Sequence, residues 1–202
     1  MPKPKLPDKD FKWTSQLAYA VGLLTTDGNL SKDGRHIVMR STDTQLLETF
    51  KDCLHISDKI TETFDNGFGK KRMYRIQPSK VQLYRWLLKI GLTPAKTYTI
   101  GALAIPNEFF RDFLRGHLDG DGSITIYKDY YNTKKNPKYV YDRLWLRFIS
   151  ASEKHITWLR ARKTELTGMK GHTWVDRSSK NPNAVPMNVL KFGKKESTRL
   201  LN

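Results

Sequence analysis

The sequence predicts an α+β fold in which one unit, helix–hairpin–helix–hairpin–helix, occurs twice. Several segments carry apolar residues at helical spacing, and alternating segments with Gly- or Asn-rich turns lie between them. The order of these segments in the first half of the chain recurs in the second half. Two Asp-Gly pairs, Asp27-Gly28 and Asp121-Gly122, hold equivalent places in the two halves. We therefore expect two pseudo-symmetric αββαββα repeats.

The first repeat begins with an apolar helix over 13–24, and Thr14 or Ser15 is suited to cap its N-terminus. The segments that follow are a hairpin at 28–41, a helix at 42–54, a hairpin at 58–77 and a helix at 79–90. Gly91 comes where a helix commonly ends in a left-handed residue. This order accounts for the first half of the chain.

The second repeat has the same order, with a longer first hairpin that carries the extra segment 127–138. Its segments are a helix at 107–118, a hairpin at 123–150, a helix at 153–166, strands near 170–176 and 185–192, and a last helix from 194. The predicted organisation is a flexible leader at 1–12, repeats at 13–91 and 106–202, and a linker at 92–105. Because that linker is short and apolar, the repeats should pack together.

The composition excludes several classes of protein. The 202 residues are 38% hydrophobic, which is enough for a core and argues against disorder. The single Cys53 can form neither an internal disulfide nor a thiolate zinc cluster. No apolar run approaches a membrane span, and the N-terminus has no secretory signal. We expect a monomer in a reducing intracellular compartment, either a bacterial or archaeal cytoplasm or an organelle.

The net charge of the chain indicates what kind of partner it binds. Lys and Arg number 36 against 20 Asp and Glu, which gives a net charge of +16. A field of this size attracts polyanions, and nucleic acid is the leading candidate. A merely soluble basic surface and a membrane-surface protein are the alternatives. The membrane alternative lacks a basic amphipathic helix, and many basic residues lie in hairpins, as at 70–75.

Two helices end in an acid followed by glycine, at Asp27 and at Asp121. In each helix a glycine precedes a small residue by four positions: Gly22 before Thr26, and Gly116 before Gly120. Residues four apart share a helix face, and small residues there allow two helices to approach at the backbone. If the helices pair through Gly22 and Gly116, the two acids meet at one end of the pair.

Two adjacent carboxylates repel each other unless they share a proton or bind a cation. Oxygen ligands with open positions suit Mg²⁺, and a bound divalent ion favours phosphodiester hydrolysis. The simpler alternative is turn chemistry, because Asp-Gly is a common turn. Two copies, each at the end of a Gly-containing apolar helix in a basic chain, favour the metal site.

The segments 20–28 and 114–122 resemble the paired motifs of the LAGLIDADG homing endonucleases, and the repeat resembles that family over nearly the whole chain. The first motif has Thr25 in place of its first acid, and the second has Arg115 and His117 where small and apolar residues are usual. The resemblance implies a magnesium-dependent endodeoxyribonuclease that makes a double-strand break. It also implies a saddle of antiparallel sheets with a central two-helix interface.

The resemblance further implies that Asp27 and Asp121 are catalytic and bind the metals, helped by the backbone carbonyls of Thr26 and Gly120. The metal is expected to be Mg²⁺, with Mn²⁺ or Ca²⁺ able to substitute for binding. A lysine after the third helix of a repeat acts at the scissile phosphate in this family, and Lys96 matches that place. The family also carries a polar residue near the end of each first hairpin, which we read as Ser41 and Ala151.

The hairpins are expected to lie in the major groove of double-stranded DNA, along a long asymmetric site on the order of twenty base pairs. In 74–77, alternation puts Tyr74 and Ile76 toward the core and turns Arg75 and Gln77 outward. For each strand the alternative is an ordinary solvated face. The predicted DNA-binding residues are Asn29, Ser31, Arg40, Lys70, Arg72, Arg75, Gln77, Ser123, Thr125, Tyr127, Lys134, Lys135 and Arg177.

Two other functions use the same scaffold. An intron RNA maturase would bind RNA without needing both acids, and a non-catalytic DNA-binding regulator would typically lose them. Retention of Asp27 and Asp121 favours the nuclease over both.

Overall fold

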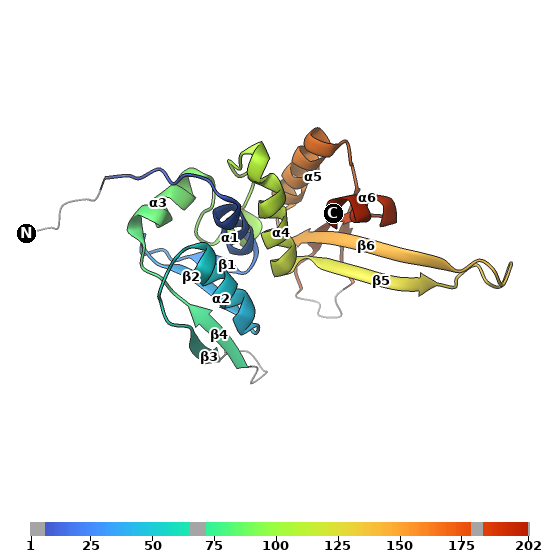
Figure 1. Cartoon of the computed structure of the whole chain (residues 1–202), viewed down its shortest axis with the longest axis horizontal. Coiled ribbons are helices and arrows are strands. Elements are labelled where there is room, and N and C mark those ends of the chain that lie inside the picture. The colour runs from blue at the N-terminus through green and yellow to red at the C-terminus, as the bar shows by residue number, and fades with distance from the viewer. Residues whose placement is uncertain (1–6, 65–71, 179–183, 202) are drawn as a thin grey trace, which may run out of the picture. The chain divides into compact units, whose positions relative to one another are not determined.

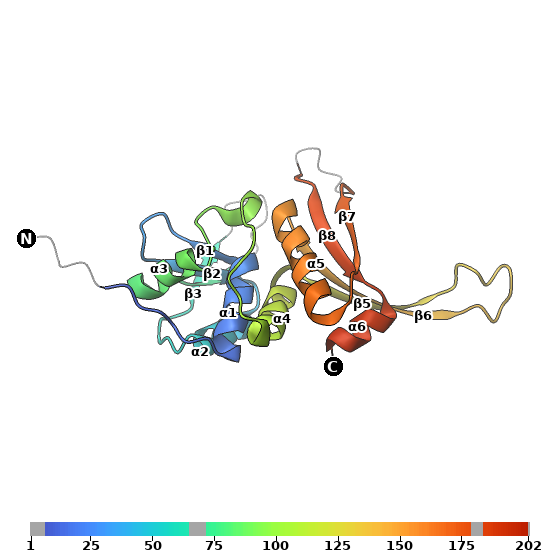
Figure 2. The ribbon, with the colours of Figure 1, turned by 90° about the horizontal axis from the view of Figure 1, so that it is seen from above.

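The computed structural model describes residues 7–64, 72–178 and 184–201. The chain divides into two compact units, Met1–Gly120 and Asp121–Asn202, and each is described by itself. Figures 1 and 2 show the elements of both units from two directions. Lys70, one of the predicted DNA-binding residues, lies outside the described residues.

The first unit contains a four-stranded antiparallel sheet in the order β1-β2-β4-β3. Its strands are β1 (Gly28–Leu30), β2 (Ile37–Ser41), β3 (Thr61–Phe64) and β4 (Arg72–Ile76). Its α-helices are α1 (Ser15–Thr26), α2 (Thr44–Cys53), α3 (Val81–Lys89) and α4 (Phe110–Asp121), the last of which ends at the border with the second unit. Short 3-10 turns at Lys96–Tyr98 and Asn107–Phe109 precede α4.

Hydrogen-bonded caps set the starts of two of these helices. The hydroxyl of Thr14 accepts from the Leu17 amide at 3.0 Å, and the carboxylate of Asp43 accepts from the Gln45 amide at 2.8 Å. Both caps satisfy amides that have no partner inside the helix. For α3 the residue at the cap position is Lys80, one residue beyond the Ser79 that the sequence suggested.

One face of the first sheet is apolar and buried. Leu30, Ile37, Met39 and Ile76 are at most 1% exposed, and α2 contacts both β2 and β4. Since side chains alternate along a strand, the intervening residues form the opposite face. That face is polar and contains Arg40 and Arg75, which lie directly opposite each other in the β2–β4 pairing.

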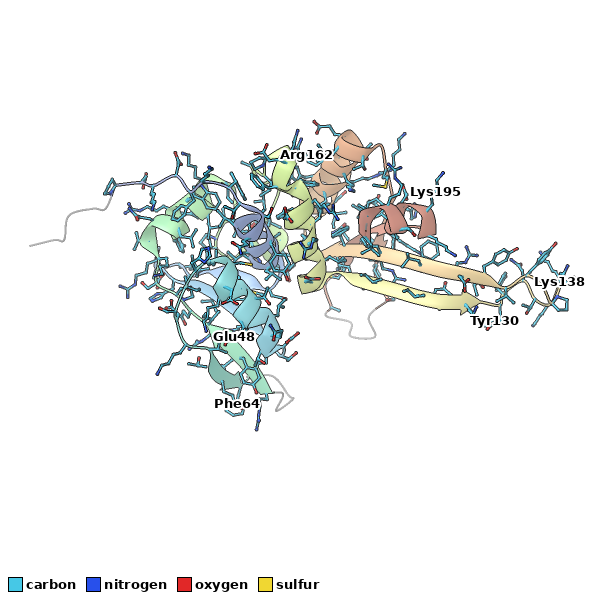
Figure 3. The ribbon with its side chains drawn as sticks, in the orientation of Figure 1. Glu48, Phe64, Tyr130, Lys138, Arg162 and Lys195 are labelled. Atoms are coloured by element: carbon cyan, nitrogen blue, oxygen red, sulfur yellow. The ribbon has the colours of Figure 1, made fainter. Side chains whose placement is uncertain are left out.

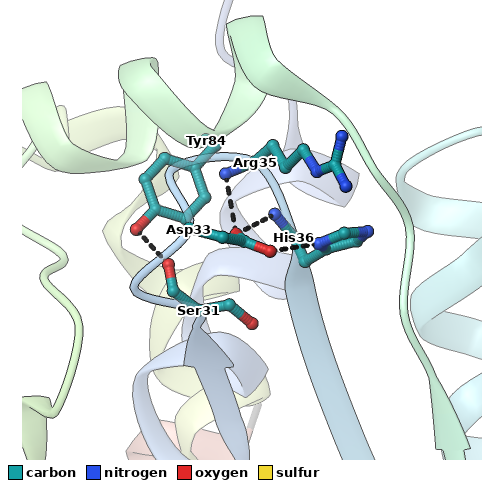
Figure 4. Close-up of polar contacts among 5 residues, drawn as sticks. All are labelled: Ser31, Asp33, Arg35, His36 and Tyr84. Atoms are coloured by element: carbon teal, nitrogen blue, oxygen red, sulfur yellow. Dashed lines mark hydrogen bonds and ion pairs between the residues drawn. The ribbon is translucent and has the colours of Figure 1, made fainter.

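The turn between β1 and β2 is held by side chains (Figure 4). The Asp33 carboxylate accepts from the backbone amides of Arg35 and His36, each at 3.1 Å, and contacts the His36 ring. The Tyr84 hydroxyl donates to the Ser31 carbonyl and so ties this turn to α3. These hydrogen bonds lower the pKa of Asp33 to about 2, with the His36 side chain as the largest cause.

The segment 7–13 lies along α3, whereas the sequence predicted a flexible leader at 1–12. Asp8 pairs with Arg85 at 3.3 Å, and Asp10 pairs with Lys89 at 2.7 Å. Trp13 packs on Trp86, with ring centroids 4.9 Å apart. Phe11 and Trp13 make the apolar contacts of this segment. The basic and proline-rich composition around them gives no sign of these contacts in the sequence.

The second unit contains a sheet in the order β5-β6-β8-β7. Its elements are β5 (Ser123–Asp129), β6 (Tyr141–Ser150), α5 (Glu153–Thr167), β7 (His172–Asp176), β8 (Met187–Phe192) and α6 (Lys194–Leu201). Leu146, Phe148, Leu190 and Phe192 are at most 3% exposed, and α5 and α6 contact β6. Residues that alternate with these, such as Arg147 and Lys191, belong to the opposite face.

The predicted fold class is confirmed. Both antiparallel sheets and the repeated αββαββα order are present in the described part of the chain. The repeat boundaries at 91 and 106 stay a prediction; the compact units divide later because α4 packs on α1 within the first unit. No helix among residues 7–64, 72–178 and 184–201 has the length and apolar character needed to cross a membrane.

Candidate active site

The helices α1 and α4 meet at backbone distance through their glycines. A Cβ atom added to Gly22 would stand 2.7 Å from the amide nitrogen of His117 and 2.9 Å from the carbonyl carbon of Gly116. A Cβ atom added to Gly116 would stand 2.9 Å from the carbonyl carbon of Tyr19. Only residues without a side chain allow this approach. The structure thus brings together the two glycines that the sequence assigned to a helix interface.

Asp27 lies at the C-terminal end of this helix pair. Its amide caps α1 by donating to the Leu23 carbonyl at 3.0 Å. Its side chain is directed toward α4, since a Cβ atom on Gly120 would be 3.3 Å from Asp27 Oδ2. Gly120 directly precedes Asp121, the exposed last residue of α4. The carboxylate of the first motif therefore lies against the backbone of the second motif, one residue before its acid.

Lys96 is buried at the same end of α1. Its side chain is only 6% exposed, and its Nζ donates to the backbone carbonyl of Thr26 at 3.0 Å. The preceding Ala95 has a left-handed φ of 53°, a conformation that favours glycine and places Lys96 at the start of a 3-10 turn. The chain thus accepts local strain where it brings an ammonium group to the carbonyl of Thr26, the residue before Asp27.

The oxygen atoms present suit a hard divalent cation. The Thr26 carbonyl is in the last turn of α1, where carbonyls lack helix partners, and it already accepts from a cationic group. No group of three or more His, Cys, Asp or Glu side chains is placed to hold an ion by itself within the described residues. A carboxylate with backbone carbonyls leaves coordination positions for water and phosphate, which is the pattern that Mg²⁺ favours.

A cavity of about 480 Å³ opens beside Asp27 on the polar face of the first sheet. Arg40 and Arg75 both contribute to it, and among the described residues neither has a carboxylate within ion-pairing distance. Two facing like charges disfavour the sheet unless an anion lies between them. The remaining lining residues are Asn29, Ser31, Val38 and Gln77. Five predicted DNA-binding residues of this unit therefore gather around the predicted catalytic acid.

Arg72 is not part of that group. Side chains alternate along β4, so Arg72 is on the face opposite to Arg75, and its Nε lies 2.8 Å from Glu62 Oε1. In the sequence Arg72 is one of several basic residues in the segment 70–75, and nothing there distinguishes it from Arg75. The ion pair with β3 depends on the strand register, which a single strand does not reveal.

In the second unit Ser123 and Thr125 are half-buried and Tyr127 is exposed, all on the face of β5 opposite to the exposed Ile124 and Ile126. Ser123, Thr125 and Tyr127 pair with Arg147, Trp145 and Arg143. Lys134 and Lys135 are exposed in the hairpin loop, and Arg177 is exposed after β7. Sequence reasoning missed Arg143, Arg147 and Lys191, although their alternation with Leu146 and Phe192 was a usable signal.

The sequence also did not reveal a contact between Tyr19 and Asp119. Tyr19 donates from its hydroxyl to Asp119 Oδ2 at 2.8 Å, and the Arg115 guanidinium lies over the Tyr19 ring. Burial and the Asp119 carboxylate raise the pKa of Tyr19 well above its usual value. Asp119 lines a second cavity, of about 600 Å³, which it shares with Asp27, Arg40 and Asp43. The first acid of the second motif therefore joins α4 to α1.

The polar residues at the ends of the first hairpins need one correction. The register pairs Met39 with Gly28, and the equivalent pairing in the second unit makes Ser150, not Ala151, the counterpart of Ser41. Both serines accept from the amide two residues later, at 3.0 Å from Asp43 and 3.1 Å from Ser152. The one-residue error arose because the turn into each helix has no distinctive sequence.

No protein-family model and no curated protein sequence matches the chain. Solved structures do match. Full-length DUF199/WhiA from Thermatoga maritima superposes with a TM-score of 0.56 at 16% identity, over 96% of this chain and 56% of that one. The homing endonuclease I-LtrWI bound to target DNA gives 0.56 at 12% identity, over 92% and 80%. I-DmoI in complex with DNA and Mn gives 0.52 at 15% identity, over 93% and 94%.

The chain therefore spans little more than half of full-length WhiA and most of the two endonucleases. At these identities the similarity concerns the fold and does not extend to activity. With its repeated element order, its two antiparallel sheets and its glycine-packed helices, the chain has the LAGLIDADG fold.

Proposed function

We propose that this protein is a site-specific endonuclease that cuts both strands of double-stranded DNA by metal-dependent phosphodiester hydrolysis. The observation that carries the proposal is the convergence of Asp27, Lys96 and the backbone of Gly120 at one end of the α1–α4 pair. Asp121, the next residue of α4, would supply the second carboxylate. The two repeats, 13–91 and 106–202, would each serve one half of an asymmetric site in a monomer.

Each group of residues at the site would have a separate role in phosphodiester hydrolysis. Asp27 and Asp121, with the carbonyls of Thr26 and Gly120, would hold Mg²⁺, which supplies an acidified water and stabilises the leaving oxygen when bound. The Lys96 ammonium would stabilise the charge that develops on the scissile phosphate. Arg40 and Arg75 would hold the duplex beside the acids, since their facing charges call for an anion.

Two similar proteins support the choice of substrate and ion. I-LtrWI is described as bound to target DNA, and I-DmoI as bound to DNA with Mn. WhiA shares the fold but is not named for a nuclease activity, so the fold alone does not decide whether this chain cuts DNA. The carboxylate that is kept in each motif favours cleavage.

The test is cleavage of a randomised plasmid library in Mg²⁺ and in EDTA, followed by sequencing of the cut sites. We expect the wild type to select one long asymmetric site and to cut it only with the divalent ion. Asp27→Asn and Asp121→Asn should then abolish double-strand cleavage of that site while binding persists. Asp43→Asn is the matched control, because Asp43 lines a cavity with Asp27 but caps α2, where Asn serves equally well. Full cleavage by either Asn variant in a motif would refute the proposal.

A further inference from the structure

Segment 7–13 lies against one face of α3 and then continues into α1 (Figures 1 and 2). The residues of α3 that it contacts follow one another at helical spacing, so they share one face of the helix. They form the α3 row, which consists of Gln82, Arg85, Trp86 and Lys89. The α3 row thus combines an amide, an aromatic ring and two cations.

The spacing of charges in the segment matches the spacing of charges in the α3 row. Asp8 pairs with Arg85 at 3.3 Å, and Asp10 pairs with Lys89 at 2.7 Å. An extended chain advances about 6.6 Å over two residues, and an α-helix rises about 6 Å over four. Carboxylates two residues apart in an extended peptide can therefore meet cations four residues apart on a helix. Gln82 adds a hydrogen bond from its side chain to the first backbone carbonyl of the segment, at 3.2 Å.

Aromatic rings complete the contact. Phe11 packs against Trp86 with ring centroids 5.6 Å apart, and Trp13 packs against the same ring at 4.9 Å. Trp86 is only 5% exposed. Trp13 also stacks on Phe109, with centroids 6.5 Å apart, which gives it an anchor outside the α3 row. The residues before Trp13 can therefore move while Trp13 itself stays in place.

The first residues of the segment are weakly held. The side chains of Asp8 and Asp10 are 85% and 76% exposed, and exposed ion pairs contribute little in water. No backbone-to-backbone hydrogen bond joins the segment to another part of the described chain. The start of α1 does not depend on the segment, since the Thr14 hydroxyl caps this helix by accepting from the Leu17 amide. The acidic part of the segment can therefore leave α3 without unfolding α1.

The contacts of the segment define what else the α3 row would bind. The occupant is a peptide, and its carboxylates, its backbone carbonyl and its ring each meet a matching group of the row. The chain has a net charge of +16, which disfavours a second copy as the occupant and favours an acidic partner. The ligand that fits best is therefore an acidic peptide with an aromatic residue.

We propose that the α3 row is a docking site for an acidic–aromatic segment of a partner protein, and that segment 7–13 occupies the row when this partner is absent. The partner's segment carries two carboxylates two residues apart and then an aromatic residue, in the order of Asp8, Asp10 and Phe11. A longer partner segment gains contacts beyond the row and so displaces the shorter internal one. This docking is separate from the proposed cleavage, because it uses no residue of the cavity beside Asp27.

The test is an NMR titration of the full chain with a synthetic peptide, Pro-Asp-Lys-Asp-Phe-Lys, which has the sequence of residues 7–12. The signals that report binding are the indole N–H of Trp86 and the backbone amides of α3. The receptor is the double variant Asp8→Asn, Asp10→Asn, whose own segment has lost both ion pairs. We expect it to bind the peptide roughly ten-fold more tightly than the wild type does, because two exposed ion pairs no longer hold the competing segment.

Charge reversal locates the contact. Lys89→Glu in the same receptor should weaken binding several-fold, and a peptide with lysine as its second charged contact, in place of the counterpart of Asp10, should restore it. Lys195→Glu is the matched control, because Lys195 is an exposed lysine on a different helix, α6 (Figure 3). The control should bind the original peptide as the receptor does and should gain nothing from the altered peptide.

Four results would overturn the proposal. Unchanged α3 signals at millimolar peptide would exclude docking of a peptide. Equal binding of a peptide with both aspartates replaced by asparagine would remove the selectivity for acidic segments. Oligothymidylate that shifts the same signals at lower concentration would assign the row to nucleic acid. A wild-type dimer in size-exclusion chromatography that is absent in the double variant would make a second copy the occupant. DNA cleavage is measured separately, so none of these results bears on the proposed nuclease function.

Discussion

The ammonium group of Lys96 donates a hydrogen bond across 3.0 Å to the backbone carbonyl of Thr26, the residue that precedes Asp27. This contact joins the segment after α3 to the end of α1, and it buries a cation with 6% exposure. Moving a cation out of water costs free energy, which hydrogen bonds such as this one offset. The proposed function gives this charge a role at the phosphate of a bound duplex, and the role can be tested by substitution.

Replacement of Lys96 by Met should reduce cleavage about a hundred-fold, the typical effect of removing one group that stabilises a developing charge. Binding of the same site with Ca²⁺ should change little, because Met fills the buried space without a charge. Single-turnover cleavage and a gel-shift assay measure the two effects separately. Lys89→Met is the control, since Lys89 is exposed and pairs with Asp10. If both variants cut equally well, Lys96 has no part in the reaction.

Gly22→Ala should destabilise the protein by about 2 kcal/mol, in the range seen when a packed interior is overfilled. The added methyl group would stand 2.7 Å from the His117 amide nitrogen, and a backbone atom cannot move aside as a side chain can. Urea unfolding measures the change. Gly101→Ala is the matched control, because nothing lies within 4 Å of its added Cβ atom. Equal stability of the two variants would show that the helices tolerate separation.

Arg75→Ala should relax base preference at one or two positions of a half-site, since each bidentate contact to a base provides about 1–3 kcal/mol of discrimination. Arg75 faces the cavity that also contains Asp27, whereas Arg72 pairs with Glu62 on the opposite face. Arg72→Ala should therefore leave the preference intact. Deep sequencing of cleaved libraries compares the two variants. Relaxed preference in the Arg72 variant instead would reverse the assignment of faces.

The Asp33 carboxylate should titrate with a pKa of about 2, lowered from 3.8 by its hydrogen bonds to His36 and Arg35. Because the folded-state pKa is the lower one, this stabilisation is present above 3.8 and is lost as the pH falls toward 2. Carbon-detected NMR of the carboxyl group follows the titration directly. In Asp33→Asn this pH dependence should disappear. A midpoint near 3.8 would mean that the β1–β2 turn does not hold the carboxylate in solution.

Local patterns in the sequence predicted the helices, the hairpins and the glycine faces, because each depends on residues within a few positions of one another. Gly22 and Gly116 could be identified from i, i+4 spacing alone, and Asp27 from the helix end beside them. Lys96 required the family resemblance. Its contact with Thr26 spans 70 positions, which no local pattern encodes.

The contacts that local patterns did not reveal depend on strand register and on residues far apart in the sequence. Arg72 looked equivalent to Arg75 until the β3–β4 pairing put Glu62 beside it. The contact of Lys191 with the Trp145 ring forms only because β6 and β8 are neighbours in the sheet. The Tyr19–Asp119 bond likewise requires α1 and α4 to be paired first.

The close packing of α1 on α4 also limits how the gene can be divided. A break in the segment 92–105 would separate the two motif helices and expose the apolar face of each, although it would cut at the boundary between sequence repeats. Fragments made there should require each other to become soluble, in the manner of split reporters. A break in the hairpin loop near Lys134 would leave the helix pair in one polypeptide, so insertion of a foreign domain is better placed there.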